Sequence, residues 1–242
     1  MFVKFQYMVL VLSLALVATA HAADFAPVKF EEVDAGMPYN AAPIPAADPH
    51  ELEGVKVAFV AAHGFEEIEL VYPYQHLLAR GATIEVISPD WIKDRVMAVQ
   101  FLKPSVWVPV TKNISQAKAT DYHAVIVPGG AWNPIIMRTD GAILDFLKQA
   151  DAAGILIASL CHGPQVLLNA GLVKGRRVTG VGDFRQDLRN AGATVIEDQP
   201  VVVDGHLLTS RDPNDVAQFA QAIERTLAAS AKRAVRYGRL DP

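Results

Sequence analysis

Cysteine is almost absent from this 242-residue chain, which contains only Cys161. A single cysteine excludes the internal disulfides that stabilise many small exported domains. It also excludes the closely spaced Cys and His pairs of structural zinc sites, and no spacing of histidines and acids replaces them. We therefore expect no metal site, and a fold that is held together by packing alone.

An excess of basic charge is also missing, because 22 Lys and Arg stand against 26 Asp and Glu. Loss of Lys4 with a cleaved signal peptide would leave 21 basic groups against the same 26 acidic ones. Binding to the phosphates of a nucleic acid requires a basic surface. The composition therefore predicts no nucleic-acid partner.

The N-terminus has the pattern of a secretory signal peptide. Lys4 precedes an apolar stretch, residues 8–20, which ends in Ala20-His21-Ala22. The stretch is shorter than the roughly 20 residues of a membrane-spanning helix, so we favour cleavage after Ala22 over an uncleaved anchor. We expect a periplasmic or secreted protein with no stable membrane insertion after cleavage.

The rest of the chain divides into a leader, one domain and a tail. Residues 23–53 are rich in Pro and Ala and read as a leader or linker, whereas residues 230–242 form a basic tail. Between them, apolar runs alternate with helical segments, which is typical of a largely parallel sheet covered on both faces. The expected strands are 55–62, 83–88, 123–127 and 155–160, and the expected helices are 66–80, 140–153 and 214–229.

Two segments depart from this alternation. Residues 89–120 carry Trp91, Trp107 and an alternating run, residues 106–110, which favours strands in a small antiparallel appendage. Near the C-terminus, two apolar runs flank Asp204-Gly205, the preferred centre of a tight hairpin turn. The fold class is therefore α/β, a mostly parallel sheet with a small antiparallel appendage.

Cys161 stands where the apolar run 155–160 ends and a helix is expected to begin. A side chain on such a turn stands above the sheet edge, where the N-terminal amides of the helix favour a thiolate. A lone buried thiol is otherwise an inert packing residue. Since adjacent side chains point in different directions, His162 is expected to shape an oxyanion site or act on substrate, and need not deprotonate Cys161 directly.

Two further segments follow strands and are expected to meet Cys161. Glu66 and Glu69 are three residues apart and would share a face on the first turn of a helix. Gly129 and Gly130 expose backbone amides that suit an oxyanion hole. Ligands collect at the carboxyl ends of parallel strands, where all three segments lie. The alternative interpretations are that the two acids only complement the helix dipole and that the two glycines only form an ordinary turn.

These segments together resemble the PfpI superfamily, which includes the PfpI-type intracellular proteases and the parkinsonism-associated deglycase and chaperone proteins. The resemblance covers about residues 55–227. It rests on four motifs, GFEEIELVYP at 64–73, VPGG at 127–130, ASLCHGPQ at 158–165 and SRDP at 210–213. It implies a PfpI-like domain over residues 54–229, with a flavodoxin-like three-layer sandwich similar to the class I glutamine amidotransferases.

The resemblance also assigns roles to the site residues. It implies that Cys161 is the nucleophile at a sharp turn and that Glu69 is hydrogen-bonded to its sulfur. Glu66 becomes a second acid in the pocket, His162 takes the post-cysteine position, and Gly129 and Gly130 become the amide donors. Members of the protease-like branch form dimers or larger rings, so the resemblance implies a homodimer or larger homo-oligomer.

The chain also departs from the protease-like branch. The branch has an acid a few residues after the glycine turn, which completes a Cys-His-Glu triad across a subunit interface. Residues 131–134 contain no acid, and Val181-Gly182-Asp183 stands where the branch has an aromatic hydroxyl. We therefore do not expect a complete protease triad within this chain.

Three functions remain open at this point. The favoured one is a cofactor-free, cysteine-dependent hydrolase or glyoxalase/deglycase-like enzyme, which attacks reactive small-molecule carbonyls through Cys161. The second is a cysteine peptidase or amidase acting on peptides. The third is a non-catalytic oxidative-stress sensor or chaperone, in which Cys161 is oxidised and stabilised by Glu69.

Overall fold

The computed structural model describes residues 41–236, with side chains as far as Lys232. The predicted signal peptide, residues 23–40 of the predicted leader and the last six residues lie outside this range. Within it, no helix is both long and apolar enough to cross a membrane.

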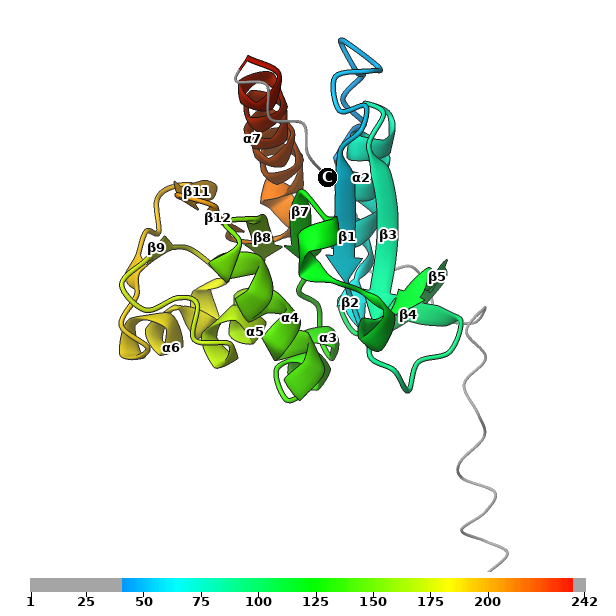
Figure 1. The fold of residues 1–242 in the computed structure, drawn as a ribbon. Coiled ribbons are helices and arrows are strands. Elements are labelled where there is room, and N and C mark those ends of the chain that lie inside the picture. The colour runs from blue at the N-terminus through cyan, green and yellow to red at the C-terminus, as the bar shows by residue number, and fades with distance from the viewer. Residues whose placement is uncertain (1–40, 237–242) are drawn as a thin grey trace, which may run out of the picture. The chain divides into compact units, whose positions relative to one another are not determined.

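A seven-stranded sheet forms the centre of the domain. Its strands are β1 (Lys56–Val60), β3 (Thr83–Ser88), β6 (Lys112–Asn113), β7 (Ala124–Val127), β8 (Leu156–Leu160), β11 (Val201–Asp204) and β12 (Leu207–Ser210). Their order in the sheet is β11-β12-β8-β7-β1-β3-β6 (Figure 1). Every pairing is parallel except that of β11 with β12. These two strands form the expected hairpin, but its two-residue turn is Gly205-His206 rather than Asp204-Gly205, because Asp204 still pairs with Leu207.

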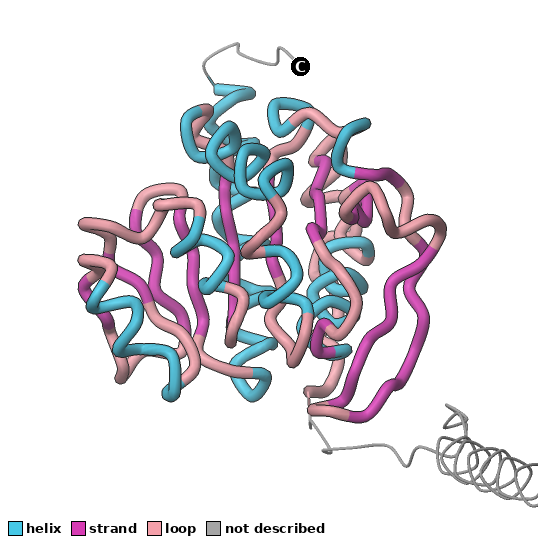
Figure 2. Tube along the Cα trace, turned by 90° about the horizontal axis from the view of Figure 1, so that it is seen from below, coloured by secondary structure: helices cyan, strands magenta, loops and turns pink. Residues whose placement is uncertain are grey.

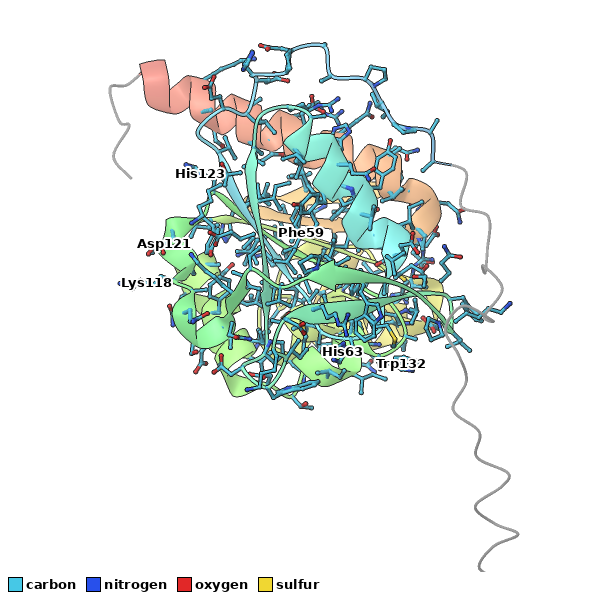
Figure 3. All side chains as sticks on the ribbon, turned by 90° about the vertical axis from the view of Figure 1, so that its right-hand side faces the viewer. Phe59, His63, Lys118, Asp121, His123 and Trp132 are labelled. Atoms are coloured by element: carbon cyan, nitrogen blue, oxygen red, sulfur yellow. The ribbon has the colours of Figure 1, made fainter. Side chains whose placement is uncertain are left out.

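Helices cover both faces of this sheet, which gives the three-layer α/β sandwich expected from the sequence. The helices are α2 (Glu67–Leu78), α3 (Asn133–Met137), α4 (Gly141–Ala152), α5 (Pro164–Asn169), α6 (Arg185–Asn190) and α7 (Val216–Arg236). Figures 1 and 3 show α2 and the start of α7 on one side of the sheet and α4 on the other. The secondary-structure colouring in Figure 2 shows strands between helices in the same arrangement.

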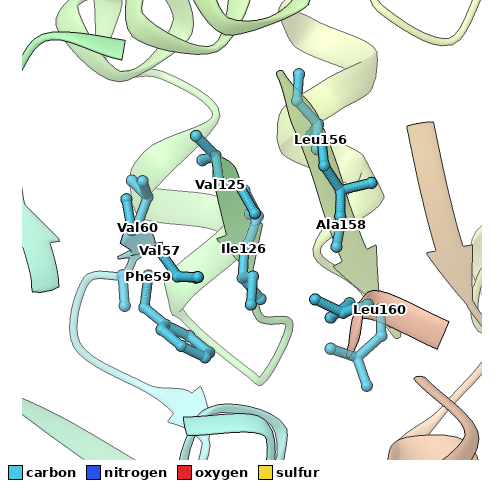
Figure 4. Packing of buried hydrophobic residues seen from close by; sticks show 14 of the residues in the cluster. Val57, Phe59, Val60, Val125, Ile126, Leu156, Ala158 and Leu160 are labelled. Atoms are coloured by element: carbon cyan, nitrogen blue, oxygen red, sulfur yellow. The ribbon is translucent and has the colours of Figure 1, made fainter. Parts of the chain in front are cut away.

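The central strands are mostly apolar because both of their faces are covered. In β1, Val57 and Phe59 are fully buried, and Ile126 of β7 and Ala158 of β8 pack in the same cluster (Figure 4). Each fully buried side chain of this size contributes roughly 1.5–3 kcal/mol by leaving water, before the entropic cost of ordering it. The core therefore holds the carboxyl ends of β1, β7 and β8 at one edge.

The appendage is a second sheet, with strand order β2-β4-β5. It consists of β2 (Phe65–Glu66), β4 (Arg95–Gln100) and β5 (Lys103–Pro109), and the β4–β5 pair is antiparallel, as the alternation in residues 106–110 indicates. A further short parallel pair joins β9 (Arg177–Val178) to β10 (Thr194–Val195).

Several boundaries differ from the expected ones. Helix α2 starts at Glu67, so Glu66 lies in extended backbone (φ −69°, ψ 123°) rather than in the first helical turn. Helix α7 continues to Arg236, so the beginning of the predicted basic tail is helical. Residues 41–45, from the end of the predicted leader, lie along α2, where Tyr72 Oη donates to the Ala42 carbonyl (3.0 Å) and Arg80 donates to the Pro45 carbonyl (3.3 Å).

Candidate active site

Cys161 occupies the sharp turn between β8 and α5, with a left-handed backbone (φ +57°). Such a conformation costs a non-glycine residue roughly 1–2 kcal/mol and persists only where neighbours hold it. Here the Cys161 N–H donates to the Ser210 carbonyl (3.2 Å), and its carbonyl accepts from the Val181 N–H (3.2 Å). The turn is thus anchored to β12 on one side and to the loop before α6 on the other.

Glu69 reaches this turn from α2 and is fully buried. Its Oε2 accepts a hydrogen bond from the Gly129 N–H (2.6 Å), and the carboxyl also hydrogen-bonds to Cys161. Its Oε1 has no hydrogen-bond partner among the described residues. Burial raises the pKa of Glu69 well above its usual range, which favours the protonated carboxyl, and a protonated carboxyl can donate to sulfur.

The Cys161 thiol is only 7% exposed, and burial raises its pKa. A negative charge on Glu69 raises this pKa further, whereas the backbone amides of His162 and Gly130 lower it. Two negative charges in contact in a poorly solvated pocket are strongly disfavoured. The pair therefore carries at most one charge near neutral pH, and the sulfur carries it only while Glu69 holds a proton.

The two glycines of the β7 turn act on different groups. The Gly129 N–H is engaged by Glu69, whereas the Gly130 N–H hydrogen-bonds to the Cys161 sulfur together with the His162 N–H. A Cβ on Gly129 would lie 2.7 Å from the His162 nitrogen and 3.0 Å from the Cys161 Cβ, so no side chain fits there. The amide donors that face the sulfur thus belong to Gly130 and His162, and Gly129 holds Glu69.

His162 contacts the sulfur directly, although the sequence analysis expected that it need not deprotonate Cys161 itself. Its Nδ1 lies 3.4 Å from Cys161 Sγ, and its Nε2 lies 3.2 Å from Asp183 Oδ2. With the ring proton on Nε2 donated to Asp183, Nδ1 can accept the thiol proton. Asp183 therefore supplies, within this chain, the acid that residues 131–134 lack.

Asp183 was not identified as a site residue from the sequence. It lies in a short 3-10 turn (Gly182–Phe184), which the hydrogen bond from Val181 to Cys161 brings beside the nucleophile. Nothing in the local pattern of residues 181–184 signals that approach.

Asn133 is a second residue that the sequence analysis did not select. It is fully buried, and its Oδ1 accepts from the Ala62 N–H (2.6 Å). Its Nδ2 donates to the carbonyls of Pro128 (2.7 Å) and Gly129 (3.1 Å). The amide therefore fastens the glycine turn after β7 to the chain leaving β1.

Glu66 lines the same region from β2 and is buried. Its Oε2 accepts from the Phe101 N–H (2.8 Å) at the tip of the β4–β5 hairpin, and its Oε1 has no partner within residues 41–236. Burial is the main cause that raises its pKa, to about 7. This carboxyl can therefore gain or lose a proton near neutral pH, which suits a general acid or base.

The raised pKa of Glu66 predicts a pH-dependent stability. Since the pKa rises from 4.5 to about 7 on folding, the folded state binds this proton more tightly between those pH values. The free energy of unfolding should fall as pH rises across that window, by on the order of 2 kcal/mol from this group. Denaturant unfolding at pH 5 and pH 8 measures the loss, and Glu66→Gln should reduce it because Gln still accepts from Phe101 without ionising.

Glu67→Gln is the matched control, because Glu67 is the next residue and is only half-buried, with a hydrogen bond from Gln100. It should leave the pH dependence of the wild-type protein in place. An identical loss of stability in wild type and Glu66→Gln would show that Glu66 is not the titrating group.

Comparisons with known proteins agree with this fold. Residues 55–226 match the model of the DJ-1/PfpI family. An uncharacterized protein of Staphylococcus epidermidis is 39% identical over 176 residues, which cover 72% of this chain and 98% of the relative. The crystal structure of Drosophila melanogaster DJ-1beta superposes with a TM-score of 0.66 at 27% identity, over 72% of this chain and 90% of that one.

A two-domain protein of Anabaena variabilis, with DJ-1/ThiJ/PfpI-like and ferritin-like domains, superposes with a TM-score of 0.67 at 32% identity. The match covers 72% of this chain and 48% of that protein. The family match over residues 55–226 includes all seven strands of the central sheet, the nucleophile turn and both loops that face it.

Proposed function

Because this chain belongs to the DJ-1/PfpI family, we propose that it is a cofactor-free enzyme in which Cys161 attacks small reactive carbonyl compounds. The proposal rests on the groups that contact the Cys161 sulfur. Glu69, His162 and two backbone amides all reach Cys161. Such a set can move a proton away from sulfur and then stabilise charge beside it.

Each group has a step in the conversion of a 2-oxoaldehyde such as methylglyoxal. His162 Nδ1 takes the thiol proton as the sulfur bonds to the aldehyde carbon, and the new oxyanion takes a proton from Glu69 to give a hemithioacetal. A carboxylate, Glu69 or Glu66, then removes the proton from that carbon to give an enediol and returns it to the neighbouring carbon, while the hydroxyl proton of the first carbon passes to the neighbouring oxygen. The first carbon is then the carbonyl of a thioester, and the second carries a hydroxyl group. Water cleaves the thioester, and lactate leaves as the thiol is restored, with no external oxidant or reductant.

The burial of Cys161 favours a small substrate over a peptide. With 7% of the residue exposed, a compact aldehyde can reach the sulfur more readily than a folded or extended polypeptide. A peptidase remains the second candidate because Cys161, His162 and Asp183 form the nucleophile, base and orienting acid that amide cleavage needs.

Product analysis tests the proposal. The purified protein is incubated with methylglyoxal without glutathione, and lactate is followed by proton NMR, in parallel with hydrolysis of fluorogenic peptides. We expect lactate to accumulate and the peptides to remain intact. Peptide cleavage without lactate would favour the second candidate, and neither product would contradict both.

The Asp183 contact predicts a modest effect on turnover. Asp183 is 70% exposed, and exposed ion pairs contribute about 1 kcal/mol or less, so Asp183→Asn should lower kcat about fivefold. Asp187→Asn, an exposed carboxylate of α6 with the same charge change, serves as the control and should leave kcat unchanged. Equal kcat values for the two variants would remove Asp183 from the mechanism.

We further propose that the protein is exported and self-associates. The signal-peptide pattern of residues 1–22 supports export, and an N-terminus at Ala23 in the secreted or periplasmic fraction would test it.

Contact with a second copy is supported by exposed apolar side chains at one edge of the appendage. They are Val106 of the edge strand β5, and Phe101 and Leu102 at the hairpin tip. Light scattering that gives a monomer mass would contradict self-association.

A further inference from the structure

All three tryptophans of the chain lie around one turn, His63-Gly64, at the carboxyl end of β1. Trp91, Trp107 and Trp132 are 55%, 42% and 39% exposed. Large aromatic side chains are usually mostly buried, and a group of exposed ones commonly marks a binding surface. We call these three residues the tryptophan cluster.

Each of the three tryptophans lies against one of the two residues of this turn. The His63 ring meets Trp91 edge-on at 5.6 Å between centroids and Trp107 at 6.0 Å. Trp132 lies directly against Gly64, since a Cβ on that glycine would be 2.6 Å from Trp132 Cβ and 2.7 Å from Cε3. Figure 3 shows His63 and Trp132 at the same edge of the domain.

Trp132 is also tied closely to the nucleophile. It follows Gly130, whose N–H hydrogen-bonds to the Cys161 sulfur, by two residues. The Trp132 N–H donates to the Gly64 carbonyl (3.2 Å), and buried Asn133 fixes the next position. The loop that presents an amide to the sulfur therefore also carries an indole ring on a rigid support.

The chemistry of this surface selects among ligands. Indole rings stack on flat apolar groups. His63 Nδ1 accepts from the Met97 N–H (3.1 Å), so the neutral ring carries its proton on Nε2 and can donate it. The carboxylate of Asp183 and, above about pH 7, that of Glu66 place negative charge beside the adjoining site, which disfavours anionic ligands. A neutral ring is the ligand that fits these properties.

We propose that Trp132, supported by Trp91 and His63, is a specificity-determining residue that stacks on an uncharged aromatic ring attached to the reacting carbonyl. Trp107 has a different partner, since the Arg95 guanidinium lies 4.7 Å from its ring centroid. The inference rests on the proposed function, because it names the substrate class of the same site. The preferred substrates are then aryl 2-oxoaldehydes rather than small aliphatic ones.

Initial rates with phenylglyoxal and methylglyoxal test the substrate class. Aromatic stacking corresponds to roughly a two- to tenfold gain in affinity, so kcat/KM for phenylglyoxal should exceed that for methylglyoxal by about two- to tenfold. Trp132→Ala should remove this preference and leave methylglyoxal within twofold of wild type, and Trp132→Phe should restore most of it. Leu78→Ala, which removes an exposed apolar side chain from the far end of α2, should change neither rate.

Equal losses on both substrates in Trp132→Ala, or no preference in wild type, would overturn the inference. So would a change in molar mass in Trp132→Ala, measured by light scattering, because the cluster would then be a contact between subunits.

A binding experiment keeps the inference separate from the proposed activity. In the inactive Cys161→Ser variant, benzamide should shift the NMR signal of the Trp132 indole N–H in a saturable way, whereas acetamide at the same concentration should not. The signal is assigned by its loss in Trp132→Phe. Without any shift by benzamide, the subsite is wrong even if lactate forms; a shift without turnover would leave the subsite standing and contradict the activity.

Discussion

Cys161→Ala should lower the rate of lactate formation from methylglyoxal by a factor on the order of 10³ or more. The proposed reaction requires a bond between sulfur and the aldehyde carbon, and no other residue of the chain carries a thiol. The measurement is the rate of lactate formation at equal concentrations of folded protein. A variant that keeps more than a tenth of the wild-type rate would contradict a role for Cys161 as nucleophile.

A loss of folding must be separated from this loss of chemistry. Alanine has the same backbone preference as cysteine at φ +57°, so the thermal midpoint of Cys161→Ala should stay close to that of wild type. Cys161→Gly should be as inactive as Cys161→Ala. Its free energy of unfolding should be roughly 1 kcal/mol higher than that of the alanine variant, because glycine adopts a positive φ without steric cost. Equal stability of the glycine and alanine variants would show that the turn is not strained.

Gly130→Ala should produce the largest loss of stability among the site variants. A Cβ at this position would lie 2.3 Å from the Glu66 nitrogen and 2.4 Å from the Gly64 carbonyl oxygen. Both are backbone atoms of a packed turn, and the residue itself has φ +97°. We expect a fall of at least about 3 kcal/mol in the free energy of unfolding, together with loss of activity as the Gly130 amide leaves the sulfur.

Gly171→Ala separates the steric cost from the backbone cost. Gly171 also has a positive φ (+78°), but a Cβ there would meet nothing within 4 Å. The free energy of unfolding of Gly171→Ala should therefore fall only by the roughly 1–2 kcal/mol that a left-handed backbone costs alanine, and its activity should be unchanged. If denaturant unfolding finds the two variants equally destabilised, the close packing of the β2 turn against Gly130 is not what requires glycine there.

Much of the fold follows from local sequence patterns. Apolar runs such as residues 124–127 and 156–160, the second interrupted only by Ser159, predict strands covered on both faces. Asp204-Gly205 predicts the hairpin, with a turn one residue from the observed one. The turn that carries Cys161 also follows from the local pattern, since an apolar run ends there and a helix is expected to begin. The flavodoxin-like arrangement and the pairing of Glu69 with Cys161 are implied only by the resemblance of four motifs to a known family. When several long motifs occur in the same order as in a family, they indicate which residues that are far apart in the sequence come together in the fold.

The remaining parts of the site depend on tertiary contacts without a local signal. Asp183 reaches His162 only because its loop hydrogen-bonds to the nucleophile turn. The Gly129 N–H donates its hydrogen bond to Glu69, so the amides that face the sulfur are those of Gly130 and His162. Glu66 is extended rather than helical because β2 pairs with β4, a contact that helical spacing does not anticipate.

The central claim is that the reaction passes through a covalent bond to the only cysteine in the chain. Protein in excess is mixed rapidly with methylglyoxal, quenched in acid at successive times and analysed by intact and peptide mass spectrometry, while lactate is measured in the same samples. The account predicts an added mass of one methylglyoxal on the peptide that contains Cys161, which rises and then decays as lactate appears, and which Cys161→Ser lacks. Lactate formed without any adduct on Cys161 would contradict it.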